Sequence, residues 1–355
     1  PSQTSCRVRS TRGSGDTMTN PNDIRGTEDA SALRRRTDPE ANPVMGAAVD
    51  DPELRDTEID ESAGPAIESM SRGELLRRRF FRNPSAWIGM VIFLVLVLMA
   101  VIGPMVYQYG PFERDLRNAL TGPSAYHWFG VNENGLDIFA RTMQGLRISL
   151  IIGIGTALLT TFLALVVGIV AGYISHKGKW GALGDGALVN LINLFLVIPS
   201  ILLLMLFSPA LQQASWLWMI PLLAGFAWML TARVLRAMTQ QLVRTEYVEA
   251  ARFMGVNPIV TMTRHIIPNI ASWIIIDTTL GVSAAILGET GLSFIGFGIQ
   301  YPQVSLGTVL QDYNISAPYT WIPPAAVLAA LVIAINLMGE ALRDALDPTS
   351  GSSRI

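Results

Sequence analysis

Four long stretches of this chain carry no charged residue. They cover residues 83–112, 148–175, 186–232 and 313–339. A helix of about 20 residues crosses a hydrocarbon core of about 30 Å, so each stretch is long enough to span a membrane. The third is too long for one helix, and the polar, proline-containing segment 208–215 divides it. A further apolar run follows Pro268.

The pattern therefore predicts an all-α polytopic membrane protein with six transmembrane helices. Helices satisfy their own backbone hydrogen bonds in lipid, which makes them suitable for runs of this length. Composition agrees, because 50% of the residues are hydrophobic and only 15% are charged, against about 25% charged in soluble domains. The predicted spans are 86–106, 149–173, 187–207, 216–235, 269–287 and 322–342.

The six spans lie in a predicted domain that covers residues 71–349. Residues 1–70 are rich in charged residues, Pro, Ser and Thr and poor in aromatic residues, which predicts a disordered cytoplasmic tail. Residues 350–355 form a short second tail. The sequence has a single cysteine, Cys6, and therefore neither an internal disulfide nor a Cys/His metal set. We expect no metal site.

Lys and Arg are distributed unevenly between the two sides of the predicted membrane. The outer loops 208–215 and 288–320 hold none, although the outer segment 107–147 holds four arginines. An excess of Lys and Arg is typical of cytoplasmic loops, so both termini are predicted to lie in the cytoplasm. The basic residues of the predicted inner loops are Lys177, Lys179, Arg233, Arg236, Arg244, Arg252 and Arg264.

An arginine cluster precedes the first span. It consists of Arg72, Arg77–Arg79 and Arg82, and it is expected to hold the N-terminal side in the cytoplasm. Two interpretations stay open: contact with anionic lipid headgroups, or a solvated basic flank.

The second span contains small residues at four-residue spacing, namely Ala164, Gly168 and Gly172. Small residues on one face let two helix backbones approach closely. The spacing therefore predicts a helix–helix contact.

A few polar residues interrupt the spans. Asp277 is predicted near the membrane midplane, where an ionisable group usually faces a pathway or a partner. Asn190 and Asn336 are further candidates for a pathway. For all three the alternative is a hydrogen bond to a neighbouring helix. Glu289 is expected to make an interfacial or loop contact at the outer end of the fifth span.

A polar segment at 245–268 separates the fourth and fifth spans. Thr245 can cap a helix that begins at Glu246, and Gly255 suits the left-handed residue that ends it. Asn257-Pro258 predicts a second helix start. The segment therefore reads as two short helices joined at a glycine.

The second short helix is predicted to end near His265, and Pro268 to begin the fifth span. In the first, Ala250 and Ala251 leave a low-profile surface that a partner can approach, and Glu249 adds one charge. Such a helix has no role in the bilayer, so the segment is predicted to be a docking surface.

Two other classes of protein fit the sequence less well. Ala182-Leu183-Gly184-Asp185 is similar to the G-x-G-D site of an intramembrane aspartyl protease, but its first glycine is missing. HExxH and G-x-S-x-G are absent from the sequence, so we expect no catalytic residue. A membrane anchor or receptor would not need the spacing in 245–268.

Four motifs in order resemble the permease subunits of bacterial ABC importers. Glu249-Ala250-Ala251-x3-Gly255-x12-Pro268 resembles the family's EAA loop, with His265 and Ile267 where the family places Ile and Leu. The others are His127–Gly130 with Gly135–Asp137 and Arg147–Leu150, Leu292–Gly298, and Arg343–Pro348. Over about 71–349 the chain resembles the dipeptide/oligopeptide/nickel class and its second, C-type, permease. Trp128 and Leu136 depart from the usual Pro and Arg.

The resemblance implies a type I ABC importer permease fold in the bacterial plasma membrane. It implies three kinds of partner: a second homologous permease, two P-loop ATPase domains that bind ATP and Mg, and an extracytoplasmic substrate-binding protein. This chain has no G-x-x-x-x-G-K-[ST], so it is expected to bind no nucleotide or other cofactor. Nucleic acid is not an expected partner. The residues implied in coupling to the ATPase are Glu249, Ala250, Ala251, Gly255, His265 and Pro268.

The resemblance also implies the cargo and an outer gate. Peptides are the implied cargo, with nickel chelates or haem as alternatives. The glycine-rich region 288–321 corresponds to a short re-entrant or surface helix near the outer gate, with Phe294 and Phe297 as candidate gate residues. The alternative for this region is an ordinary outer loop.

Overall fold

The computed structural model describes residues 72–346 except 177 and 213–214, so the predicted tails lie outside the described residues. The described part is helical, with two isolated β-bridges, Arg114–Leu136 and Val131–Asp137. Its longer helices are α3 (Arg72–Arg82), α4 (Pro84–Val106), α5 (Ile138–Ile174), α6 (Gly178–Val197), α7 (Ser200–Gln212), α8 (Met219–Leu242), α9 (Glu246–Phe253), α11 (Ile267–Phe294) and α13 (Ile322–Leu346). Shorter turns are α10 (Pro258–Thr261), α12 (Leu306–Leu310), a π-helical stretch Met262–Ile266, and 3₁₀ turns Leu116–Asn118, Trp216–Trp218 and Pro318–Thr320.

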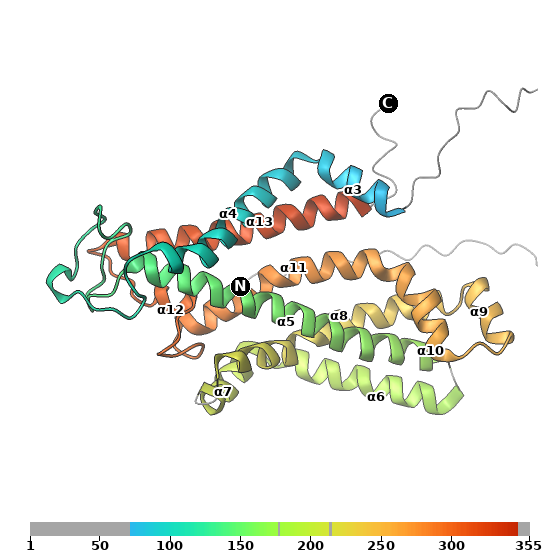
Figure 1. The fold of residues 1–355 in the computed structure, drawn as a ribbon. Helices are drawn as coiled ribbons and strands as arrows, with labels where there is room; N and C mark the ends of the chain where they lie inside the picture. The colour runs from blue at the N-terminus through green and yellow to red at the C-terminus, as the bar shows by residue number, and fades with distance from the viewer. Residues whose placement is uncertain (1–71, 177, 213–214, 347–355) are drawn as a thin grey trace, which may run out of the picture. The chain divides into compact units, whose positions relative to one another are not determined.

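Within the described residues, six helices are long and apolar enough to cross a membrane, as predicted. They contain α4, α5, α6, α8, α11 and α13. Successive spans run in alternate directions. The α9–α10 segment therefore lies at the same end as the start of α4 and the end of α13, and α12 lies at the other (Figure 1). We call these the coupling end and the outer end.

The bounds predicted for the third span, 187–207, are wrong. The chain forms α6 and α7 there, and Pro199 lies between them. Proline lacks an N–H and disfavours helical geometry in the residue before it, so α6 ends at Val197. The 13 residues of α7 are too few to cross the core. Hydropathy did not show this break because the residues on both sides are apolar.

Three other spans extend clearly beyond their predicted bounds. α5 begins at Ile138 rather than at 149, and Asp137 caps its start by accepting a hydrogen bond from the Ala140 N–H at 2.8 Å. α8 continues to Leu242 rather than ending at 235, and α11 continues to Phe294 rather than ending at 287. Hydropathy detects the part of a helix that suits lipid, and these helices extend past that part.

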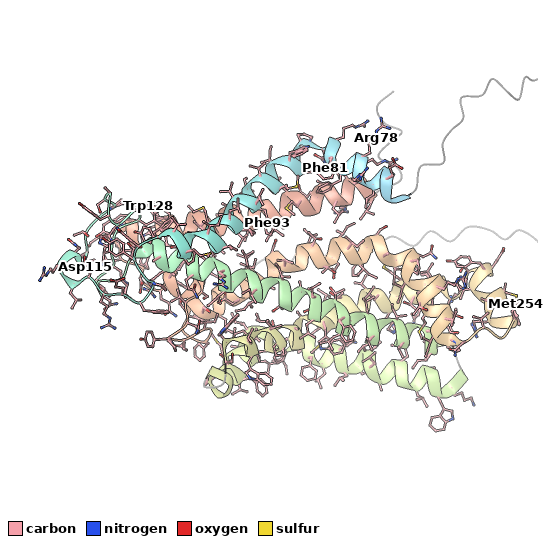
Figure 2. The ribbon with its side chains drawn as sticks, viewed as in Figure 1. Arg78, Phe81, Phe93, Asp115, Trp128 and Met254 are labelled. Atoms are coloured by element: carbon pink, nitrogen blue, oxygen red, sulfur yellow. The ribbon has the colours of Figure 1, made fainter. Side chains whose placement is uncertain are left out.

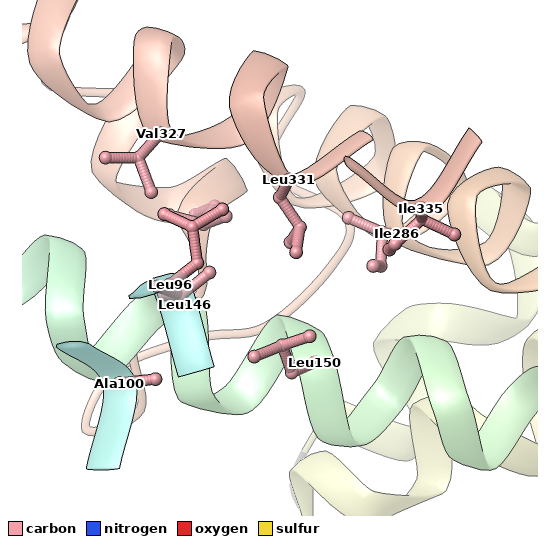
Figure 3. Packing of buried hydrophobic residues seen from close by; sticks show 9 residues of the cluster. Leu96, Ala100, Leu146, Leu150, Ile286, Val327, Leu331 and Ile335 are labelled. Atoms are coloured by element: carbon pink, nitrogen blue, oxygen red, sulfur yellow. The ribbon is translucent and has the colours of Figure 1, made fainter. Parts of the chain in front are cut away.

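α5 is the central helix of the bundle. It packs on α4, α8 and α11, and α13 packs on α4 and α11. One buried apolar cluster joins four of these helices (Figure 3). Its main members are Leu96 and Ala100 of α4, Leu146 and Leu150 of α5, Ile286 of α11, and Val327, Leu331 and Ile335 of α13.

The predicted close contact of the second span is confirmed, and its partner is α8. A Cβ added at Gly168 would lie 2.6 Å from the Ala232 carbonyl oxygen, and one at Gly172 would lie 2.7 Å from the Arg236 carbonyl oxygen. Ala164 is fully buried in the same interface cluster. The α8 backbone therefore occupies the space that a side chain on this face of α5 would need.

Gly168→Ala should separate α5 from α8 and lower stability by about 1–3 kcal/mol, the usual effect of overpacking. In a domain of this size the apparent melting temperature should fall by several degrees. Gly184→Ala is the matched control, because a Cβ at Gly184 meets no atom within 4 Å. Thermal unfolding of both variants in detergent tests this. An equal melting temperature for Gly168→Ala and wild type would contradict the close contact.

Candidate functional site

α9 is a short polar helix at the coupling end, between α8 and α10. Thr245 precedes it as predicted, but its hydroxyl donates to the Leu242 carbonyl at 2.6 Å rather than capping α9. Asn257 does cap the next turn, because its Oδ1 accepts from the Ile259 N–H at 2.9 Å. The predicted two-helix layout of the segment is thus observed.

Gly255 ends α9 in the left-handed conformation, with φ at +75°. The Val256 N–H donates to the Ala251 carbonyl at 3.1 Å and the Gly255 N–H donates to the Arg252 carbonyl at 3.0 Å. This pair of bonds is a Schellman motif, which closes a helix when a residue without a Cβ penalty takes the left-handed position. The predicted role of Gly255 in local structure is confirmed.

α9 divides its side chains between a buried and an exposed face. Val248 and Ala251 are buried, whereas Glu249 and Ala250 are exposed. The prediction that both alanines form an accessible surface is therefore wrong for Ala251. Positions 248 and 251 lie on the same side of a helix, with 250 turned away.

The exposed face continues into an apolar tip that the sequence analysis missed. Phe253 is 83% exposed and Met254 75% exposed, and Met254 lies at the end of the loop (Figure 2). Ile259 and Val260 of α10 are exposed as well. Apolar side chains gathered in a segment outside the predicted spans indicate a binding surface. In the sequence, the position of these apolar residues on either side of Gly255 could have indicated this surface.

Pro268 lies in the first turn of α11 (Ile267–Phe294), as predicted for the start of the fifth span, although α10 and the π-helical stretch continue into α11 without a break. Pro268 has no N–H to donate, and the turn before it is π-helical, with the Ile267 N–H bonded to the Met262 carbonyl. The chain changes direction between α10 and α11 (Figure 1), as helices do at proline and at π turns. His265 lies in this turn, with its ring 6.4 Å from that of Tyr247 of α9.

Asp277 is half-buried in α11 and faces α8. The Thr231 hydroxyl of α8 donates to Asp277 Oδ2 at 3.1 Å. The next residue, Thr278, shares a 2.8 Å hydrogen bond with Thr161 of α5. Asp277 therefore makes a hydrogen bond to a neighbouring helix, which was the alternative to a role in the pathway. Part of its surface remains accessible.

The other pathway candidates lie elsewhere. Asn190 is exposed on α6, which packs on α5 and α8, and Asn336 is half-buried on α13, which packs on α4 and α11. Among the described residues, no hydrogen bond joins any two of Asn190, Asp277 and Asn336. Their shared role in a pathway stays a prediction.

Asp185 of α6 forms an ion pair with Arg236 of α8 that the sequence analysis missed. Both carboxylate oxygens accept from the guanidinium, and the Gln240 amide donates to Oδ2 at 3.4 Å. Asp185 is buried and Arg236 half-buried. Because both oxygens of the carboxylate are paired, this ion pair is suited to holding α6 against α8.

Glu289 is fully buried, and of the two contacts expected for it the structure shows the loop contact. Ser149 of α5 donates to Oε2 at 2.9 Å, and Ser293 of α11 donates to Oε1 at 2.6 Å. Each serine oxygen also accepts a backbone N–H, from Leu306 at 3.2 Å and from Ile299 at 3.0 Å. Glu289 therefore holds α12 and the 295–305 loop against α5 and α11.

The candidate gate residues flank this network. Phe294 is exposed at the end of α11, and Phe297 is half-buried against the cluster formed by α5, α7 and α8. The Ser208 hydroxyl of α7 donates to the Phe297 carbonyl. α12 confirms a short helix in 288–321, but residues 288–294 belong to α11 and not to a loop.

At the outer end, the segment between α4 and α5 is organised around Asp137. Its Oδ2 lies 2.7 Å from His127 Nδ1 and accepts from the Tyr107 hydroxyl at 2.8 Å. Burial, and then the hydrogen bond to Asp137, raises the pKa of Tyr107. Trp128 packs on Tyr107 and Phe139. This arrangement uses two residues of the outer motif, His127 and Asp137, and accommodates the unusual Trp128.

Two protein families match this chain. Residues 164–351 match the family described as "Binding-protein-dependent transport system inner membrane component". The chain belongs to this family. Residues 71–123 match the N-terminal TM domain of oligopeptide transport permease C. The chain is therefore a permease subunit of an ABC importer and a multi-pass inner membrane protein, and the predicted C-type assignment is confirmed.

Similar proteins cover about three quarters or more of the chain. The chain is 41% identical over 291 residues to "Oligopeptide transport system permease protein OppC" of Mycobacterium tuberculosis, covering 81% of this chain and 98% of that protein. It is 34% identical over 274 residues to the protein of the same name from Bacillus subtilis, with coverage of 76% and 87%. A putative peptide permease protein of Brucella melitensis is 32% identical over 295 residues, with coverage of 82% and 93%.

Among solved structures, the chain is similar to one from the MetNI methionine ABC transporter in an inward-facing conformation. The TM-score is 0.45 at 18% sequence identity, over 58% of this chain and 96% of that chain.

Arg236→Met should destabilise the permease by roughly 2 kcal/mol or more, because it leaves the buried Asp185 carboxylate unpaired. The double variant Asp185→Leu/Arg236→Met should recover most of the loss, since it removes both charges. Arg233→Met, on the exposed side of the same helix, is the matched control. Thermal unfolding in detergent measures all three. A double variant that is as unstable as the single one would contradict the ion-pair explanation.

Proposed function

We propose that this permease imports oligopeptides and is driven through α9 by an ATPase partner at its cytoplasmic face. The observation that carries the proposal is the exposed surface of Glu249, Ala250, Phe253 and Met254 at the coupling end. The peptide cargo is supported by the names of the relatives, which are oligopeptide or peptide permeases.

The orientation rests on basic residues. Arg77, Arg78, Arg79, Arg82, Lys179, Arg244, Arg252 and Arg264 lie at the coupling end or next to it. The outer end has Arg114, Arg117, Arg141 and Arg147. The positive-inside rule then places α9 in the cytoplasm, where nucleotide-binding partners are found.

α9 has the properties of a transmitting element. Val248 and Ala251 anchor its inner face in the permease, and the Schellman motif fixes its end. Its exposed apolar residues offer a partner the desolvated contact that gives an interface most of its affinity. A partner that binds this tip would displace the start of α11, because only residues 254–257 separate α9 from α10, and α10 and the π-helical stretch continue into α11.

Membership of the family supports a proposal for the remaining parts of the assembly. We propose that a second, homologous permease completes the pathway, that two P-loop ATPase domains hydrolyse ATP with Mg, and that an extracytoplasmic binding protein delivers the cargo. This chain has no P-loop sequence, which supports ATP hydrolysis on the partner chains. ATP then acts as the ligand that favours one of two permease conformations.

Glu249→Lys should lower peptide-stimulated ATP hydrolysis by tenfold or more, because it reverses the charge at a close contact with the partner. Glu133→Lys is the matched control, since Glu133 is exposed at the outer end. The measurement uses the reconstituted complex in vesicles and a mass-labelled mixture of tri- to hexapeptides.

Gly255→Val should also lower peptide-stimulated ATP hydrolysis, because it introduces strain at positive φ. Gly255→Asn should retain more of this activity because Asn tolerates that conformation. Normal stimulation in Glu249→Lys and Gly255→Val would overturn the proposed role of α9.

Asp277→Asn should reduce peptide uptake severalfold while leaving complex assembly and basal ATP hydrolysis unchanged, if the accessible part of this carboxylate lines the pathway. Thr231→Val is the control, because it removes the same interhelical hydrogen bond and keeps the charge. The two variants are compared by uptake of the same peptide mixture. Equal defects in both would assign Asp277 to helix packing.

A further inference from the structure

α3 is a strongly basic helix that directly precedes the first span. Arg77, Arg78, Arg79 and Arg82 are exposed, and Glu74 is the acidic residue of the helix. Arg78 and Phe81 lie on α3 beside the coupling-end half of α4 and α13 (Figure 2). Neither the exposed surface of α9 nor the candidate pathway includes this helix.

α3 is attached to the bundle by specific contacts. Asn83, between α3 and α4, caps α4 by accepting from the Ser85 N–H at 3.0 Å, and its amide donates to Asp344 Oδ2 of α13 at 3.1 Å. The indole N–H of Trp87 donates to the Phe81 carbonyl at 2.8 Å. Exposed tryptophan at a span end is typical of the membrane–water interface. α3 is therefore held at the level of the lipid headgroups.

Two hollows lie on neighbouring sides of α3. The first is open to the surface, has a volume of about 470 Å³ and is lined along α3 by Glu74, Arg77, Arg78, Phe81 and Arg82, three of which are arginines. The second has a volume of about 290 Å³ and is mainly apolar, lined by Gly73, Leu76, Arg77, Phe80, Thr279, Met338 and Leu342. Arg77 lines both hollows, so a cationic surface adjoins an apolar one.

We propose that this double hollow binds an anionic phospholipid of the cytoplasmic leaflet. Arg77, Arg78 and Arg82 would hold the headgroup phosphate, since arginine clusters next to membrane helices attract anionic headgroups. An acyl chain would occupy the hollow between α3, α11 and α13, where Leu76, Phe80, Met338 and Leu342 give it apolar contact. Glu74 reduces the positive charge at the rim and disfavours a second headgroup.

The apolar hollow favours a phospholipid over anions that lack an acyl chain. A free phosphate or an acidic protein segment would satisfy the arginines but would leave Phe80, Met338 and Leu342 without a partner. A phospholipid matches both halves and is present at this level of the membrane. Thr279 of α11 lines the apolar hollow and lies two residues from Asp277, so the lipid would contact the same helix that carries the pathway candidate.

Lipid retention tests the proposal. The purified complex with the full-length chain is equilibrated with equal amounts of dioleoyl phosphatidylglycerol and dioleoyl phosphatidylcholine, and the bound lipids are counted by native mass spectrometry. We expect selective retention of phosphatidylglycerol, weakened about fivefold for each arginine replaced in Arg77→Gln/Arg78→Gln/Arg82→Gln. Arg114→Gln/Arg117→Gln, on exposed residues of the outer segment, is the control for loss of surface charge; it matches the double variant Arg77→Gln/Arg78→Gln and should retain the lipid.

A second variant tests the apolar half without changing charge. Leu342→Trp fills the hollow and should lower phosphatidylglycerol retention severalfold, whereas Ile333→Trp, exposed on the same helix, should not. Glycerol 3-phosphate, which has the phosphate but no acyl chains, should fail to displace the lipid. Equal retention of the two lipids, displacement by glycerol 3-phosphate, or full retention in Leu342→Trp would each overturn the proposal.

Discussion

The close contact between α5 and α8 is the constraint on which the arrangement of the bundle depends. At Gly168 and Gly172 the backbones meet with no room for a side chain. In lipid there is little hydrophobic drive between helices, so such contacts are set by packing and by hydrogen bonds. The position of α8 on α5 in turn sets where α9 leaves the membrane, because only the residues 243–245 separate α8 from α9.

α5 also organises the outer end. The helix continues well beyond the length that a bilayer requires, and Asp137 at its start joins the cap of the helix to Tyr107 and His127. At the first residue of the predicted second span, Ser149 donates a hydrogen bond to the carboxylate of Glu289. The same helix therefore supports the outer segment, the α12 network and the α8 contact.

The sequence predicted features that depend on local rules. Gly255 and Asn257 follow turn and capping chemistry, the spacing of Gly168 and Gly172 follows helix geometry, and the six spans follow hydropathy. Features that depend on distant partners were missed. Asp185 meets Arg236 across 51 positions, and Ser149 meets Glu289 across 140. No local pattern marks such pairs, so the partners of Asp185 and Glu289 were not predicted. The prediction that Ala251 is accessible was wrong, and the break at Pro199 was hidden by its apolar surroundings.

The π-helical stretch before α11 has a mechanical consequence. α11 has 28 residues, which is a rod of about 42 Å at 1.5 Å per residue. A tilt of about 5° around the turn at Met262–Ile266 would move its far end by about 4 Å. Glu289 and the loop that it holds lie near that far end, so under such a tilt a small displacement near α10 would be enlarged on the opposite side of the membrane. α11 would then work as a lever whose short arm is the α10 turn.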